Sequence, residues 1–178
     1  MTRSGVVLAG TIVLDVVHMI DQWPDEEQIA FIRQTIEAPG GPPHNAAAGL
    51  VKLGAAFPVQ MICVVGDDAV GETFIRIAGE LGLDTSNVIR VNGHSTDLTH
   101  VMTSKATGRR TFFFKPGANR TMTAEQMLPA HDKGKIYYLG SPGISTSMDA
   151  SDGWRKALGA ARQRGYKTCM ELCPVPPE

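Results

Sequence analysis

The stretch "APGGPPHNAAAGLVKLGAA" at residues 38–56 combines residue types that can shape a backbone and bind a polar ligand. Gly40 and Gly41 are adjacent, two prolines follow, and Asn45 precedes an alanine-rich segment. Glycines let a backbone approach a ligand closely, and an asparagine amide can donate and accept hydrogen bonds. The same residues could only form a turn and an N-cap. The two interpretations are compatible, because a capped helix N-terminus also points toward a site.

Other candidates follow predicted strands, where open parallel sheets usually bind their ligands. Asp15 comes after an apolar run. Because an unpaired buried carboxylate is costly, Asp15 must either accept hydrogen bonds from the backbone or meet a polar ligand. The further candidates at strand ends are Gly66, Asp67, Gly117, Asn119, Gly140 and Ser141. Carboxylates, amides and glycines together suit a hydroxyl-rich ligand. Asp67 and Asp68 are predicted mainly to cap the following helix.

Neither the histidines nor the cysteines indicate a metal site. His44 and His100 have no partner at a metal-binding spacing, and we expect both to be surface or lid residues. Cys63, Cys169 and Cys173 are an odd number without a zinc-like spacing, so they are predicted to be buried, reduced thiols of a cytoplasmic protein.

Composition and missing motifs exclude several classes of protein. The chain has 17 Lys and Arg against 18 Asp and Glu, so no basic excess points to nucleic acid or a membrane surface. Gly10 and Asp15 interrupt the apolar N-terminus, which favours a buried strand over a signal peptide. No apolar run reaches the roughly 18 residues of a membrane span. Neither G-x-G-x-x-G after the first strand nor G-x-x-x-x-G-K-[ST] is present.

The elements that must position these residues alternate between strand and helix. Predicted strands or hairpins lie at residues 5–17, 28–36, 57–66, 86–91, 98–114, 135–141 and 166–172, and helices at 45–53, 67–82 and 147–165. This order predicts an α/β fold with a mostly parallel sheet and flanking helices. The polar-faced strands at 28–36 and 98–114 should pair with each other as a small β lid. Asn45 is the expected N-cap of the first helix, and Gly54 follows its end.

Taken in order, these residues resemble the N-terminal part of the ribokinase-like (PfkB) sugar kinases. "GGPPHNAA", with Gly54 and then Gly66 opening "GDDAVGETF", resembles the first family signature. "GTIVLDVV" followed by "DQWP" resembles the first strand, and "KPGANRTMT" resembles the Gly-Ala-Asn turn of the family. The resemblance covers essentially the whole chain.

The resemblance implies a ribokinase-like fold in which the lid strands close over a sugar and could pair two subunits. Asp15 would hydrogen-bond sugar hydroxyls, Gly40 and Gly41 would line the pocket with their backbone, and Asn45 would bind a hydroxyl. Val13, His100, Asn119 and Gly140 are further substrate or lid positions. The family transfers the γ-phosphoryl group of ATP, with Mg²⁺, to a sugar or nucleoside hydroxyl.

The sequence also departs from the family pattern. Pro42-Pro43, Val13 and Gly140 stand where ribokinases have Lys-Gly, Asn and Glu, and the segment from Gly54 to Gly66 is two residues longer. These differences weigh against ribose as the substrate.

The second family signature, Asp-Thr-x-Gly-Ala-Gly-Asp, which supplies the catalytic base, is absent. We therefore expect residues 1–178 to be the N-terminal part of one ribokinase-like domain, inactive alone, with the base and most of the ATP site beyond residue 178.

Two alternatives remain at this point. The chain could be a non-catalytic module that binds a sugar or nucleoside, or that provides a dimerisation surface. It could also be an unrelated α/β domain that binds a nucleotide such as NAD(P), although the glycine fingerprint for this is missing.

Overall fold

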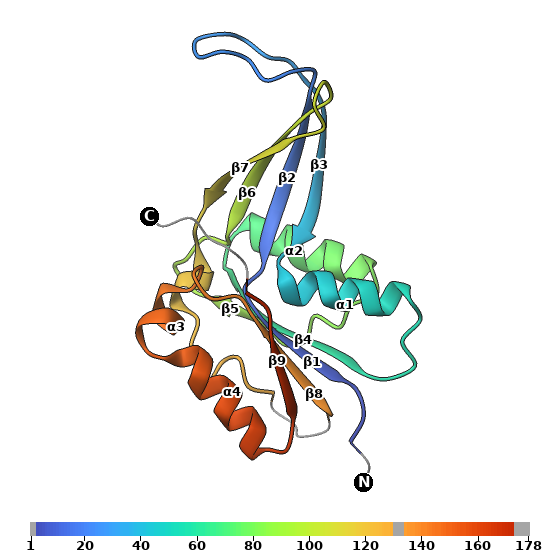
Figure 1. Cartoon of the computed structure of the whole chain (residues 1–178), viewed down its shortest axis with the longest axis vertical. Coiled ribbons are helices and arrows are strands. Elements are labelled where there is room, and N and C mark those ends of the chain that lie inside the picture. Colours follow the sequence, from blue (N-terminus) through green and yellow to red (C-terminus); the bar gives the residue numbers. More distant parts are fainter. Residues whose placement is uncertain (1–2, 130–133, 173–178) are drawn as a thin grey trace.

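The computed structural model describes residues 3–129 and 134–172, which form a core sheet and a separate lid sheet (Figure 1). The core sheet has the strand order β5-β4-β1-β8-β9, and every neighbouring pair is parallel. Its strands are β1 (Val6–Gly10), β4 (Val59–Gly66), β5 (Val88–Val91), β8 (Ile136–Gly140) and β9 (Lys167–Met170). The predicted α/β fold with a mostly parallel sheet is confirmed.

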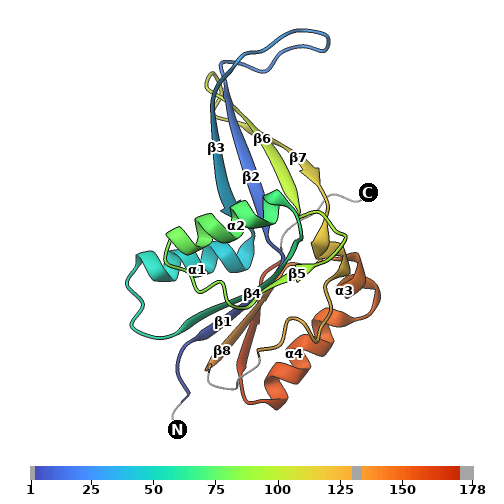
Figure 2. The ribbon, with the colours of Figure 1, turned by 180° about the vertical axis from the view of Figure 1, so that it is seen from behind.

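Helices cover both faces of the core sheet (Figures 1 and 2). Helices α1 (Pro42–Lys52) and α2 (Ala69–Glu80) lie on one face, and α3 (Thr146–Ala150) and α4 (Gly153–Gln163) lie on the other. Alternate residues of a strand enter different cores: Leu8 packs with Phe74 of α2, whereas Val7 packs with Trp154 of α4. Burial on both faces explains the continuous apolar runs of β1 and β4.

The lid sheet is confirmed, but its predicted pairing is wrong. Its order is β3-β2-β6-β7, with β2 (Val13–Ile20), β3 (Ile32–Gly40), β6 (Leu98–Ser104) and β7 (Arg110–Lys115). The strands expected at 28–36 and 98–114 do not pair with each other, because β2 lies between them. Strand β2 is antiparallel to β3 and parallel to β6. The hairpin of β6 and β7 is present as expected.

The apolar run at residues 5–17 is divided between the two sheets. Strand β1 ends at Gly10 and β2 begins at Val13. Gly10 has φ 133°, and a Cβ atom there would lie 1.5 Å from the carbonyl oxygen of Gly140, so only glycine fits. The side chain of Asn119 holds the link, because its Nδ2 donates to the Ile12 carbonyl oxygen at 2.6 Å and its Oδ1 accepts from the Ile12 N–H at 3.4 Å.

Two helix predictions need correction. Helix α1 begins at Pro42, not Asn45, with Gly41 at the N-cap position. Proline is favourable at the start of a helix, where an N–H has no intrahelical partner, so the helix starts earlier than a cap at Asn45 would allow. The single helix expected at 147–165 is instead α3 and α4, separated by Asp152, which has a left-handed φ of 58°.

The other local predictions have mixed outcomes. Asp68 caps α2 by accepting from the Gly71 N–H at 2.9 Å, whereas Asp67 accepts from the Gly93 N–H and is not a cap. Cys63 is buried, but Cys169 is exposed because β9 is an edge strand. The prediction for Cys173 lies outside the described residues. Within residues 3–129 and 134–172, no helix has the length and hydrophobicity to cross a membrane.

Candidate functional site

The lid meets the carboxyl edge of the core sheet near the start of α1 (Figure 1). Several predicted binding residues lie there, with Gly40 at the end of β3 and Gly140 at the end of β8. Gly10 of β1 pairs with Gly140 of β8, and the Thr11 N–H donates to the Gly140 carbonyl oxygen at 2.8 Å. A Cβ atom at Gly140 would lie 3.2 Å from Cβ of Pro42, the first residue of α1. Gly140 therefore lies beside the first turn of α1.

Gly40 makes room for the carboxyl group of Asp15. Val13 pairs with Gly40, and Val13 and Asp15 lie on the same face of β2 because they are two residues apart. A Cβ atom at Gly40 would lie 2.7 Å from Oδ2 of Asp15 and 3.2 Å from Cγ1 of Val13. Any larger residue at position 40 would displace the carboxyl group or the valine.

Asp15 is half-buried, and its hydrogen-bond partner is a side chain of the neighbouring strand. Burial raises the pKa of Asp15, while a hydrogen bond from Thr99 and the positive charge of Arg110 act in the opposite direction. Thr99 is buried and pairs directly with Asp15. Sequence reasoning missed Thr99, because its role depends on the parallel pairing of β2 with β6. A partly desolvated carboxylate of this kind is suited to accept hydrogen bonds from ligand hydroxyls.

Gly41 packs the start of α1 against the link between β1 and β2. Its φ is 93°, and a Cβ atom there would lie 2.5 Å from the Thr11 carbonyl oxygen. Pro42 and Pro43 have no N–H, so among the first three helical positions only His44 has a backbone donor. This helix start is a weaker anion site than one with all its amides, and it is better suited to neutral hydroxyl groups.

Asn45 lies in the first turns of α1 and is exposed to a groove of about 490 Å³. Ala38, the residue paired with Asp15, lines the same groove. His44 was expected at the surface or in the lid, but it is only 4% exposed and lies against Phe74 of α2. The reason is helical geometry: α1 packs on α2, and the third helical position faces that contact.

Other predicted site residues are placed elsewhere or have structural partners. Asn119, in the 3₁₀ helix Ala118–Thr121, is buried with both ends of its amide bonded to Ile12. His100 lies on the lid face opposite to Asp15, since it is next to Thr99, and its Nδ1 is 3.0 Å from Nε2 of His18. A direct ligand contact of either residue remains a prediction.

Gly66 and Gly117 have a packing role that the sequence did not show. A Cβ atom on either would lie 2.2 Å from a backbone oxygen, of His94 and Ser95 respectively. The loop before β6 therefore packs directly on both glycines. Asp97 of this loop is also buried; its Oδ2 accepts from the Asn119 N–H at 3.0 Å, and burial raises its pKa.

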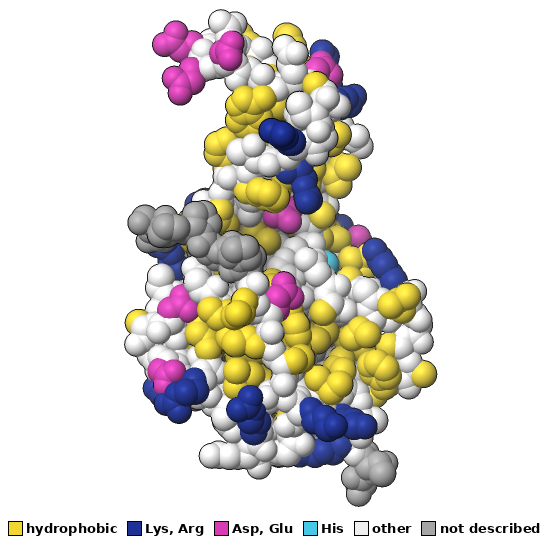
Figure 3. Space-filling model, in the orientation of Figure 1, with side chains coloured by type: hydrophobic (Ala, Val, Ile, Leu, Met, Phe, Trp, Pro, Cys, Tyr) yellow, Lys and Arg dark blue, Asp and Glu magenta, His cyan; other side chains and the backbone are white. Residues whose placement is uncertain are grey.

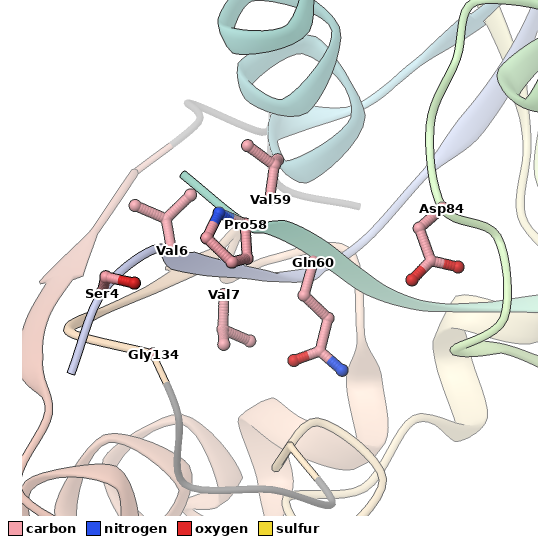
Figure 4. Close-up of a pocket in the computed structure, with 8 residues that line it drawn as sticks. All are labelled: Ser4, Val6, Val7, Pro58, Val59, Gln60, Asp84 and Gly134. Atoms are coloured by element: carbon pink, nitrogen blue, oxygen red, sulfur yellow. The ribbon is translucent and has the colours of Figure 1, made fainter. Parts of the chain in front are cut away.

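A second cavity, of about 230 Å³, lies at the opposite, amino-terminal edge of the core sheet. Figure 4 shows Val7 and Gln60 pointing to the same side of β1 and β4, as their pairing requires. The lining residues are Ser4, Val6, Val7, Pro58, Val59, Gln60, Asp84 and Gly134. None of them belongs to the predicted site, so the cavity lies apart from Asp15 and Asn45.

The described residues do not supply a metal site. In residues 3–129 and 134–172, no three His, Cys, Asp or Glu side chains come together as potential ligands. Asp15 and Asn45 instead have the chemistry to bind a neutral polar ligand.

A parallel core sheet with a β lid over its carboxyl edge is the architecture of the ribokinase-like kinases. The crystal structure of fructokinase from Xylella fastidiosa matches with a TM-score of 0.76 at 21% identity, covering 98% of this chain and 52% of that chain. The structure of Arabidopsis thaliana ribokinase complexed with ribose and ATP matches with a TM-score of 0.71 at 22% identity, covering 96% of this chain and 53% of that one. These likenesses establish the ribokinase-like fold.

Residues 4–176 match the pfkB family of carbohydrate kinases, and the chain belongs to this family. Fructokinase-1 of Zea mays is 31% identical over 144 residues, which are 78% of this chain and 42% of that protein. Fructokinase-2 of Oryza sativa is 29% identical over 164 residues, 89% of this chain and 46% of that protein. The chain spans about half the length of these relatives. The family match removes the support for an unrelated nucleotide-binding domain.

Proposed function

We propose that this chain provides the sugar-binding and lid half of an ATP-dependent carbohydrate kinase. The observation that carries the proposal is the half-buried carboxyl group of Asp15, which lies at the base of the lid where Gly40 leaves it room. Family membership supports the reaction class. Because the similar curated proteins are named fructokinases, fructose is the first substrate candidate, before other sugars, polyols and nucleosides.

In this proposal the chain binds and orients the acceptor hydroxyl and excludes water. Asp15 accepts hydrogen bonds from sugar hydroxyls, Asn45 binds another hydroxyl, and the backbone at Gly40 and Gly41 lines the pocket. Closure of the lid prevents transfer to water. ATP with Mg²⁺ supplies the phosphoryl group, and the catalytic base is expected beyond residue 178, so the 178-residue chain alone should be inactive.

The lid could also join two subunits of a cytoplasmic homodimer. Trp23, Phe112, Phe113 and Phe114 of the lid are all at least 43% exposed. Figure 3 shows hydrophobic side chains on the lid surface above a narrower waist. Exposed apolar side chains gathered in this way are typical of surfaces that another molecule covers.

The reaction class is tested by ADP production with the complete protein over a panel of fructose, ribose, other sugars and nucleosides. We expect turnover of at least one sugar, with fructose the first candidate. A complete, folded protein that converts none of them at high concentration would refute the proposal.

Asp15→Asn tests the site assignment. Loss of a charged hydrogen-bond partner costs about 1.5–3 kcal/mol, which corresponds to a roughly 10- to 150-fold higher KM for the sugar, with little change in the KM for ATP. Asp21→Asn is the matched control, because Asp21 pairs with Arg33 at the exposed end of β2. An unchanged sugar KM in Asp15→Asn would show that Asp15 does not bind the sugar.

A non-catalytic binding or dimerisation module is the alternative, motivated by the absence of the second family signature from residues 1–178. Calorimetry on the 178-residue chain separates the two proposals. Sugar binding by a protein whose complete form has no kinase activity would favour the module.

A further inference from the structure

His44 is a buried histidine whose ring contacts the side chain of its neighbour, Asn45. Its Nδ1 lies 3.3 Å from Oδ1 of Asn45. The ring packs edge-on against Phe74, with the ring centroids 5.7 Å apart. Its other nitrogen, Nε2, is buried without a hydrogen-bond partner. The imidazole is therefore held in one orientation by a single polar contact and an apolar wall.

The polar contact determines which atoms carry protons. A carbonyl oxygen only accepts, so the hydrogen bond requires the proton on Nδ1 of His44. Burial lowers the pKa of His44, which keeps the ring neutral and leaves Nε2 without a proton. If the amide of Asn45 were reversed, Nδ1 would accept and Nε2 would carry the proton, so the orientation of the amide and the tautomer of the ring are coupled.

We propose that His44 is a positioning residue that turns the carbonyl oxygen of Asn45 inward and presents its NH₂ group to the ligand groove. Asn45 is exposed to that groove while its Oδ1 is engaged by the buried ring. Position 45 then acts as a hydrogen-bond donor, whereas Asp15 acts as an acceptor. A ligand that contacts both residues would need one hydroxyl that donates to Asp15 and another that accepts from Asn45.

The effect of His44 on sugar binding rests on the proposed function. The orientation of His44 and Asn45 relative to each other does not. The geometry is tested directly by long-range ¹⁵N–¹H NMR of the histidine rings in the 178-residue chain near pH 7. We expect His44 to be the neutral tautomer with the proton on Nδ1. A ring protonated on Nε2 alone would overturn the proposal, whether or not any sugar binds.

The consequence for binding is tested by three variants of the complete protein, with fructose and any other accepted sugar as probes. His44→Leu keeps the burial and removes the donor, so the sugar KM should rise roughly three- to tenfold with a smaller change in kcat. His44→Asn places an amide donor near the position of Nδ1 and should recover most of the lost affinity. Val64→Ala is the packing control, because Val64 is buried in the other core, and it should lower the melting temperature while leaving the sugar KM near its original value.

The outcomes distinguish positioning from simple packing. If His44→Asn were as impaired as His44→Leu, and both losses followed the melting temperature, His44 would serve the fold only and the proposal would be wrong. If the unaltered complete protein used no sugar, the proposed function would fail instead, and the tautomer measured by NMR would still decide the orientation of Asn45.

Discussion

The core sheet and the lid sheet both contain apolar strands, but they differ in how far these strands are covered by the rest of the chain. Residues 61–66 of β4 are all buried, because helices cover both faces of the core. All six residues of β7 are exposed, including the consecutive Phe112, Phe113 and Phe114. An apolar run therefore indicates a strand in both cases, but only in the core does it indicate a covered one. The lid leaves these hydrophobic side chains exposed.

The largest contrast is expected between an aromatic residue of the core and one of the lid. Phe74→Ala removes a fully buried side chain and should lower the free energy of unfolding by about 3–5 kcal/mol. Phe113→Ala removes a side chain that is 51% exposed and stacks on Trp23, so we expect less than about 1 kcal/mol. Urea unfolding of both variants measures the difference. Equal losses would mean that the lid is covered in solution.

Two glycines of positive φ allow the stability of the junction to be compared with that of the lid tip: Gly41 lies at the junction and Gly108 at the tip. Gly108→Ala, in the lid hairpin with φ 68° and open space around its Cβ position, should cost about 1–2 kcal/mol for the backbone conformation alone. Gly41, with φ 93° and ψ 152°, lies in a region that essentially only glycine adopts, and a Cβ atom there would also lie 2.5 Å from the Thr11 carbonyl oxygen. We expect the larger loss of stability, and a weaker affinity for sugar, at Gly41. A Gly41→Ala protein as stable as Gly108→Ala would show that the junction tolerates movement.

The smallest expected effect is on the pH dependence of stability, which should differ between His44 of the core and His18 of the lid. Burial lowers the pKa of His44 below 6.5, and the positive charge of Lys52 acts in the same direction. Glu37 is a further charged residue that lines the groove beside His44. The unfolded state then binds more protons than the folded state. The contribution of His44 is present above about pH 6.5 and is lost as the pH falls through its folded pKa.

Urea unfolding of the original chain and of His44→Asn at pH 7.5 and 5.5 isolates this contribution. The buried carboxyl groups of Asp15 and Asp97, whose raised pKa values act with the opposite sign, cancel in the difference. We expect the stability advantage of the original chain to shrink at pH 5.5. His18→Asn in the lid should change less, because His18 is less buried than His44. Identical pH profiles for the original chain and His44→Asn would contradict the burial of a neutral ring.

The sequence predicted the elements of the core well, because burial of each element leaves a local pattern. Buried strands are continuous apolar runs, and the helices carry apolar residues at helical spacing. It predicted Asp15, Gly40 and Gly41 as one group of candidate binding residues, and the structure places them close together. The helix start at Pro42 was missed, because an N-cap side chain is a strong local signal while a glycine of positive φ followed by prolines is a weaker one.

What the sequence could not show depends on contacts between distant residues. The division of residues 5–17 between two sheets follows from the close approach of Gly10 to Gly140, 130 residues further along the chain. The hydrogen bond from Thr99 to Asp15 needs the pairing of β2 with β6, and the burial of His44 needs the packing of α1 on α2. No local pattern contains any of these three facts.

The parallel pairing of β2 with β6 at the centre of the lid also has a consequence for how the chain folds. His18 and His100, which meet across this pair, are separated by 82 residues that include β4, α2 and β5. Contacts of such long sequence separation form late, because the intervening chain must first be ordered or its loop-closure entropy must be overcome. During synthesis β2 cannot gain its β6 neighbour until residue 104 has emerged. The exposed aromatic strand β7 is thus the last strand of the lid to emerge, while β8 and β9 of the core sheet follow it in the chain.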